Sequence, residues 1–184
     1  MRKIGFALTA MMAVVGCKSK DAGTPVDQIL EIGIQAEQEL AEIATKQAES
    51  KDLSEIVELG KQEKVVRDSA TSRINQLLGG KGARLPLAVA PCTDTLPIVC
   101  GNGSIGIPDF HKGVFRINVQ IASTQKKPLP EGAFFQIAAL DAQGKVLASK
   151  DASVVDSLKI GDSLYAGGLF KAVDIRGMAS VSAR

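Results

Sequence analysis

The sequence predicts an α+β protein in which an N-terminal helical arm precedes a small antiparallel β-sandwich. Residues 25–78 are rich in the helix formers Glu, Gln, Ala, Leu and Lys, and no proline follows Pro25 in this stretch. Residues 92–184 instead show short apolar runs, separated by Gly-, Pro- and Asp-containing breaks at intervals of about ten residues. Between them, residues 79–91 contain three glycines and two prolines, which indicates a hinge.

Residues 1–16 have the layout of a secretory signal peptide. Two basic residues, Arg2 and Lys3, precede an apolar run over residues 4–15. The run is shorter than the roughly 20 apolar residues that a membrane-spanning helix needs. We therefore expect this segment to direct export.

The apolar run ends in a motif that resembles the bacterial lipobox, made of Val14, Val15, Gly16 and Cys17. The resemblance implies that Cys17 is lipidated and becomes the mature N-terminus, with residues 17–24 as a lipid-attached linker. Acyl chains that contribute roughly 0.8 kcal/mol per buried CH₂ hold a protein durably on a membrane. Residue 18 is Lys rather than Asp, which by the same resemblance favours the outer membrane. We expect a lipid-anchored protein of the bacterial cell envelope that faces the periplasm.

The helical arm, residues 25–78, contains two apolar stripes with helical spacing. Thr24 and Pro25 suit the N-cap and the first helical position, and Asp52 suits a second N-cap. The stripes consist of Ile29, Ile32, Ala36, Leu40 and Ile43, and of Ile56, Leu59, Val66, Ala70, Ile74 and Leu77. The arm is either an antiparallel hairpin with its turn near residues 49–52 or one long helix. We favour the hairpin, because the two stripes can then cover each other.

The predicted β-sandwich occupies residues 92–184. The clearest strand alternates Phe115, Ile117, Val119 and Ile121 with polar residues. The stretches "FFQIAALDAQGKVLAS" and "LKIGDSLYAGGLF" resemble the small immunoglobulin-like sandwich domains called FxLYD, which occur in bacterial surface and periplasmic proteins. That resemblance implies an interaction module rather than an enzyme.

Two further cysteines, Cys92 and Cys100, are predicted to form a disulfide. Export implies an oxidising compartment, and these two remain as a pair once Cys17 is lipidated. A metal site built on them lacks partners, because His111 is the only histidine of the chain.

Two other motifs contain residue types that occur in cofactor-binding or catalytic sites. Gly101, Gly103 and Gly106 match the spacing of the dinucleotide fingerprint, but Pro108 follows where a helix should begin. We predict a turn there, with Asn102-Gly103 as its central pair. His111 is predicted to lie in a solvated loop. We therefore expect no catalytic residues, no metal and no cofactor.

Charge excludes a nucleic-acid partner. Residues 18–82 hold nine basic and 12 acidic side chains, and residues 83–184 hold 11 and 8, so neither part is strongly basic. We predict a non-catalytic role in binding or supporting another envelope component, with an unidentified envelope protein as partner. Three alternatives stay open: a scaffold lipoprotein that forms a homo-oligomer through its helical arm, an immunity or inhibitor lipoprotein that blocks a periplasmic toxin or hydrolase, and an enzyme of the cell wall.

Overall fold

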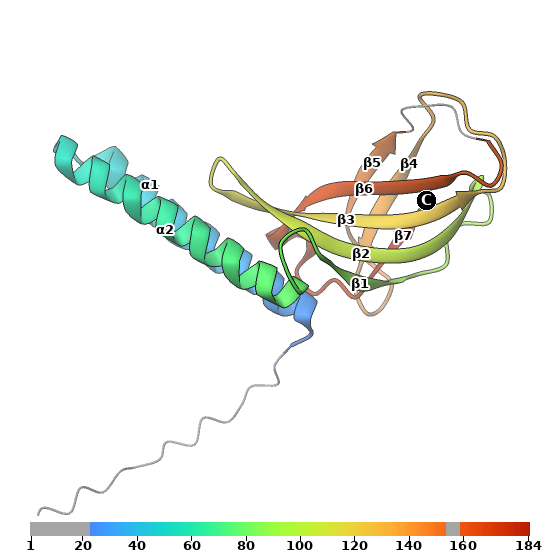
Figure 1. The fold of residues 1–184 in the computed structure, drawn as a ribbon, viewed down its shortest axis with the longest axis horizontal. Helices are drawn as coiled ribbons and strands as arrows, with labels where there is room; N and C mark the ends of the chain where they lie inside the picture. Colours follow the sequence, from blue (N-terminus) through green and yellow to red (C-terminus); the bar gives the residue numbers. More distant parts are fainter. Residues whose placement is uncertain (1–22, 154–158) are drawn as a thin grey trace, which may run out of the picture.

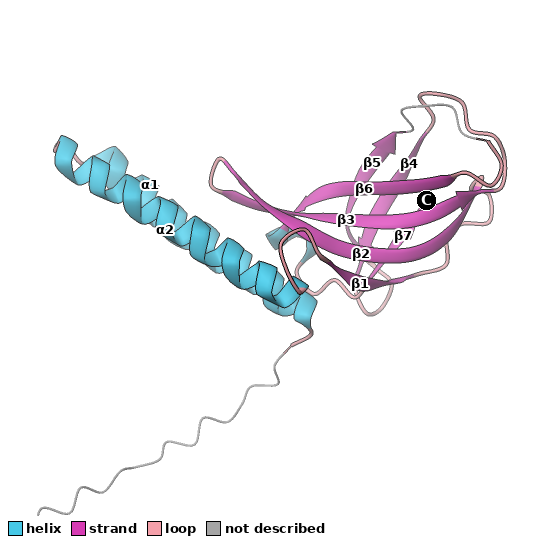
Figure 2. Cartoon of the chain, in the orientation of Figure 1, coloured by secondary structure: helices cyan, strands magenta, loops and turns pink. Residues whose placement is uncertain are grey.

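The computed structural model describes residues 23–153 and 159–184 and confirms the α+β class (Figure 2). Two helices, α1 (Pro25–Glu49) and α2 (Leu53–Leu78), precede the strands. The other elements are β1 (Arg84–Val89), β2 (Ile98–His111), β3 (Val114–Gln125), β4 (Phe134–Leu140), β5 (Val146–Ser153), β6 (Ser163–Lys171), the 3-10 helix η1 (Ala172–Ile175) and β7 (Ser180–Ala183). The predicted signal peptide, lipobox and lipidated Cys17 lie outside the described residues.

Local signals explain why the helical segment is a hairpin. The hydroxyl of Thr24 accepts a hydrogen bond from the Asp27 amide at 3.2 Å, and the Thr24 amide donates to the Asp27 carboxylate at 3.0 Å. Asp52 caps α2 by accepting a hydrogen bond from the Ser54 amide at 2.8 Å. The hairpin prediction is therefore confirmed, with residues 50–52 as the turn, and the single long helix is excluded.

One end of the hairpin packs against the core of the sheet. Ile29 of α1 and Ile74 of α2 are fully buried in the same apolar cluster as the inward side chains of β3. Gly33 allows the close contact, because a Cβ atom at this position would lie 1.9 Å from Cδ1 of Phe115. The first turns of α1 and the last turns of α2 thus form the base of the hairpin.

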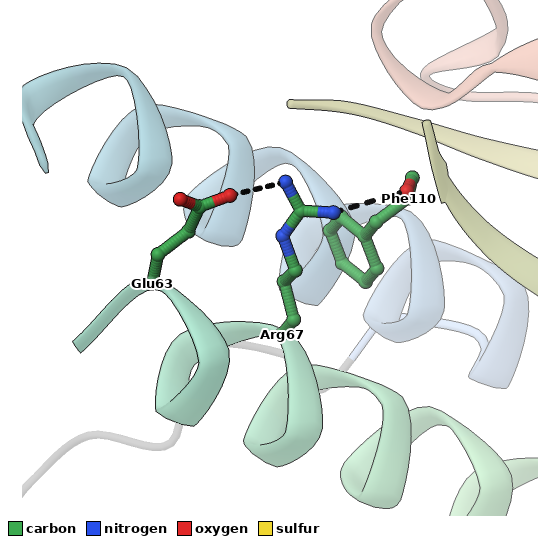
Figure 3. Close-up of polar contacts among 3 residues, drawn as sticks. All are labelled: Glu63, Arg67 and Phe110. Atoms are coloured by element: carbon green, nitrogen blue, oxygen red, sulfur yellow. Dashed lines mark hydrogen bonds and ion pairs between the residues drawn. The ribbon is translucent and has the colours of Figure 1, made fainter. Parts of the chain in front are cut away.

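Polar contacts fix the direction of the hairpin relative to the sheet. Arg67 of α2 donates a hydrogen bond to the Phe110 carbonyl oxygen at 3.3 Å and forms an ion pair with Glu63 (Figure 3). On the other helix, the Glu37 carboxylate accepts a hydrogen bond from the Phe115 amide. Each helix is therefore hydrogen-bonded to the β2–β3 strand pair.

Within the described residues, the strands form one mixed sheet in the order β5-β4-β7-β1-β2-β3-β6. Neighbours are antiparallel except β1 and β7, which are parallel. The sheet curls until its edge strands meet: a Cβ atom on Gly168 of β6 would lie 2.7 Å from Cβ of Lys150 of β5. The protein therefore has a curled sheet around one interior instead of the expected all-antiparallel sandwich (Figure 1).

Strand β3, which lies between β2 and β6, confirms the predicted alternation. Phe115, Ile117, Val119 and Ile121 are fully buried, and the residues between them are half-buried. The apolar side chains fill the interior, and the polar ones form part of an outer surface. This separation gives the sheet two faces of different chemistry.

Strand β1 lies within residues 79–91, where the sequence predicted a hinge. Pro86 is compatible with this strand, although proline lacks an amide hydrogen. Strand β7 pairs with β1 only at Ala88 and Val89, so the side of β1 that faces away from β2 is open at Pro86. The sheet therefore begins at Arg84, earlier than the predicted boundary at residue 92.

The predicted turn at Asn102-Gly103 is wrong, because these residues lie inside β2. The glycines permit close packing of neighbouring backbones instead. A Cβ atom at Gly103 would lie 2.7 Å from the Leu87 carbonyl oxygen, and one at Gly106 would lie 2.9 Å from that of Ala83. Register shifts occur in β2 beside both glycines, as expected where a sheet bends sharply.

Candidate functional site

Cys92 and Cys100, the predicted disulfide pair, are bonded in the structure with their Cα atoms 6.1 Å apart. The bond joins the connection after β1 to the beginning of β2, at the end of the sheet away from the helices (Figure 1). A cavity of about 310 Å³ lies beside the bond. The pair closes a short loop and so stabilises this end of the sheet.

His111 is the exposed last residue of β2, not a loop residue, and it precedes the tight turn at Lys112-Gly113. In residues 23–153 and 159–184, no three His, Cys, Asp or Glu side chains gather as metal ligands would. The described side chains therefore do not indicate a metal centre.

The solvent side of β1, β2, β3 and β6, here called the outer face, is the candidate site. In Figure 1 it is turned toward the viewer, with β4, β5 and β7 behind it. Strand register places outward residues in rows across the four strands. One row contains Arg84, Gly106, Asn118 and Leu169, and the next contains Pro86, Ser104, Gln120 and Gly167. These rows bring together side chains from four separate stretches of the sequence.

Arg84 is held rigidly in the first row. Its Nε donates a hydrogen bond to the Ser104 hydroxyl at 2.7 Å, and its Nη2 donates to the Asn118 side-chain oxygen at 2.8 Å. Partial burial lowers the pKa of the Arg84 guanidinium from its ordinary value, because desolvation disfavours the charged form. The group nevertheless stays protonated, as arginine does in proteins. Arg84 is therefore a fixed cation bound to neutral groups.

Tyr165, the only tyrosine of the chain, stands on the same face with 68% of its surface exposed. It lies opposite Ala122 of β3, a residue with a small side chain. Two residues further along β6, Gly167 leaves space for the side chain of Gln120. A Cβ atom added at position 167 would lie 3.2 Å from both Cβ and Cγ of Gln120. An exposed aromatic ring therefore stands beside a row of polar groups.

The charges of the outer face are mainly positive. Arg116 of β3 and Lys171 of β6 are directly opposite each other, and Asp109 of β2 is opposite Arg116 on the other side. No carboxylate of the described residues lies within 4.0 Å of the cationic groups of Arg84, Arg116 or Lys171. Because like charges on opposite positions destabilise a sheet, a bound anion would relieve the repulsion.

The helical hairpin exposes less apolar surface for self-association than its sequence suggested. The stripe residues Ile29, Ile32, Leu40, Ile43 and Ile74 are buried inside the protein rather than displayed on its surface. Leu53 and Val57 near the hairpin turn remain exposed, as does Val65 in the middle of α2. Val65 lines a groove of about 410 Å³ that has both acidic and basic residues on its rim. Neither α1 nor α2 has an apolar stretch long enough to cross a membrane.

A larger groove, of about 760 Å³, lies between the start of α1 and β1. Val26, Leu87 and Met178 are among its lining residues. All three are buried, so they serve the core as well as the groove. Nothing in the described residues indicates what this groove holds.

Sequence reasoning did not identify the residues of the outer face as a group. Asn118 and Gln120 were predicted on the polar side of a strand, but Arg84 was placed in a hinge and Tyr165 in a separate short strand. Only the strand order, which puts β6 beside β3 and β1 beside β2, brings them together.

Comparison of the chain with protein-family models, with curated proteins and with solved structures found no match. The outer face therefore has to be interpreted from its own geometry and charge.

Proposed function

We propose that this protein is a lipid-anchored component of the bacterial cell envelope, and that it binds another envelope component without catalysing a reaction. The observation that carries the proposal is the outer face, which combines the exposed ring of Tyr165 with the hydrogen-bonded group of Arg84, Ser104 and Asn118. Side chains that are already ordered lose little entropy on binding, which favours recognition.

The N-terminal sequence supports the proposed location in the cell envelope. Val14-Val15-Gly16-Cys17 resembles a lipobox, and the Cys92–Cys100 disulfide suits an oxidising compartment. The proposal places the protein on the outer membrane, with its sheet in the periplasm. Residues 17–24 then connect the lipid to the base of the hairpin, and the sheet lies close to the membrane attachment.

The Cys17→Ala variant tests whether a lipid anchors the protein to the membrane. We expect the variant to lose incorporation of labelled palmitate and to leave the membrane fraction or remain uncleaved, because no acyl chain is attached. Mature variant protein that remains on the membrane would contradict the lipid anchor.

The binding role is tested by placing a photo-crosslinking amino acid at position 165 in intact cells. We expect one dominant adduct, either a single envelope protein or material retained with the cell wall. The same amino acid at Phe134, which is 74% exposed on β4 and outside the outer face, serves as the matched control. Identical adducts from both positions would contradict a specific surface, and adducts only with the protein itself would favour the scaffold alternative.

A further inference from the structure

The polar centre of the outer face resembles neither a protein interface nor a lipid-binding patch. Protein interfaces typically have an apolar, aromatic core and a polar rim. Here the polar side chain of Gln120 lies between the apolar side chains of Tyr165 and Leu169, and Asn118 is opposite Leu169. None of the cavities described above is lined by Asn118, Gln120 or Tyr165, so the ligand meets an open surface of amide, hydroxyl and guanidinium groups.

Saccharides match this combination of groups. The C–H bonds on one side of a sugar ring carry partial positive charge and stack on the negative face of an aromatic ring. Sugar hydroxyl groups both donate and accept hydrogen bonds, as do the amides of Gln120 and Asn118. Outward residues of one strand recur at every second position, about 7 Å apart, so Asn118 and Gln120 offer hydrogen-bonding groups at regular points along β3.

The positive charge of the outer face favours acidic saccharides over neutral ones. Arg84, Arg116 and Lys171 are cationic and Asp109 is the only opposing acid in the two charged rows. Asp109 is opposite Arg116 on one side only, and Lys171 has no acid opposite it in the register; a carboxylate bound between Arg116 and Lys171 would pair with both cations, whereas a neutral sugar would not.

We propose that the outer face binds a glycan strand whose sugars carry carboxylate groups. Tyr165 stacks on a sugar ring, Gln120 and Asn118 bind hydroxyl groups, and Arg116 with Lys171 binds a carboxylate. Arg84 holds the Asn118 side chain in place and adds positive charge. This inference rests on the proposed function and names the chemical class of the envelope component.

The first experiment measures binding of the full-length lipidated protein in detergent to immobilised glycans. One is murein glycan freed of its peptides by an amidase, so that its lactyl groups end in free carboxylates. The other is chitin, a neutral chain of a related amino sugar. We expect binding to the acidic glycan that is at least roughly tenfold tighter than to chitin and that weakens with added salt, because screening reduces ionic attraction. Equal affinities, or no binding to the acidic glycan, would overturn the proposal.

Tyr165→Ser tests the stacking contact. We expect a loss of affinity for the acidic glycan of roughly tenfold, since aromatic stacking and the associated burial are removed. Phe134→Ser removes an equally exposed aromatic residue from a different part of the sheet and should leave the affinity unchanged. Equal losses in the two variants would mean that general hydrophobicity, not the outer face, retains the glycan.

The double variant Arg116→Gln, Lys171→Gln tests the charge. Lys171 is exposed, Arg116 is half-buried, and their removal relieves a repulsion, so the variant is expected to fold. We expect it to lose the preference for the acidic glycan over chitin while Tyr165-dependent binding remains. An unchanged preference would overturn the assignment of the carboxylate. If position 165 captures an envelope protein and no glycan binds, the proposed function stands and the glycan inference fails.

Discussion

The two ends of the helical hairpin both carry apolar residues at helical spacing, but different interactions stabilise them. At the base, Ile29 and Ile74 are fully buried against the core of the sheet, and Gly33 touches Phe115. Near the hairpin turn, Leu53 and Val57 are exposed, and the buried residues Leu59 and Ile43 do not belong to the core cluster of the sheet. The base is therefore held by tertiary packing, whereas the tip depends on caps and on contacts within the hairpin. Equal substitutions at the two ends should have unequal effects.

The largest effect is expected from removing a core side chain at the base. Ile74→Ala should lower the free energy of unfolding by about 3 kcal/mol, because it deletes buried methylene groups and leaves a cavity. Val57→Ala at the tip should change it by less than about 0.5 kcal/mol, since Val57 is 60% exposed. Urea unfolding followed by circular dichroism measures both, and similar losses would contradict the contrast.

Reduction of Cys92–Cys100 tests a third region, the end of the sheet away from the helices. Opening this short loop should lower the free energy of unfolding by about 2–3 kcal/mol in the chain-entropy description. The thermal midpoint should fall by several degrees. Hydrogen exchange in folded protein should rise near β1 and β2 and stay constant at the base of the hairpin. Increased exchange at the base as well would show that the two ends are coupled.

Gly33→Ala should destabilise the protein by about 2 kcal/mol, because the new Cβ atom overlaps the Phe115 ring in a filled core. Gly60→Ala is the matched control in α2. A Cβ atom there meets only Gln47 Nε2, at 3.9 Å, so the better helix propensity of alanine should stabilise the protein by up to about 1 kcal/mol. Thermal unfolding distinguishes the two signs, and stabilisation by Gly33→Ala would disprove the close contact.

The smallest effect concerns the cap at the tip. Hydrogen bonds from Ser54 lower the pKa of Asp52 below its ordinary value of 3.8. Because the folded pKa is the lower one, the stabilisation by this carboxylate is present above the ordinary value and is lost as the pH falls through the folded one. The amide signals at the start of α2 should therefore report fraying in acid. Asp52→Asn retains a capping oxygen that does not titrate, so its signals should be insensitive over the same range.

The hairpin was predictable because its signals are local. Thr24, Pro25 and Asp52 mark helix starts wherever the rest of the chain lies, and the alternation through Phe115 and Ile121 marks a strand. The curled sheet was not predictable from such signals. Gly103 and Gly106 resemble turn residues, yet glycine is needed at each because a backbone carbonyl oxygen of Leu87 in β1, or of Ala83 just before it, lies too close for a side chain.

The outer face was hidden for the same reason. Its rows depend on the pairing of β6 with β3 and on β1. The sequence predicted a hinge instead of β1, because Pro86 and the nearby glycines are typical of hinges. A polar residue in an alternating strand shows only which side it faces. Which other residues share that side is decided by strand order, and this order is a property of the whole chain.

The parallel pair of β1 and β7 has a consequence for the timing of assembly. Within the described residues, β7 (Ser180–Ala183) is the only strand that pairs with both β1 and β4. Without β7, the pair β4-β5 and the group β1-β2-β3-β6 share no strand pairing in this part of the chain. A chain that crosses a membrane with its N-terminus first delivers the helices early and this connecting strand about 90 residues after β1. Throughout that interval the inward side chains of β3 and β4 lack their final cover. If the chain is exported as proposed, it needs protection from aggregation until its last strand arrives.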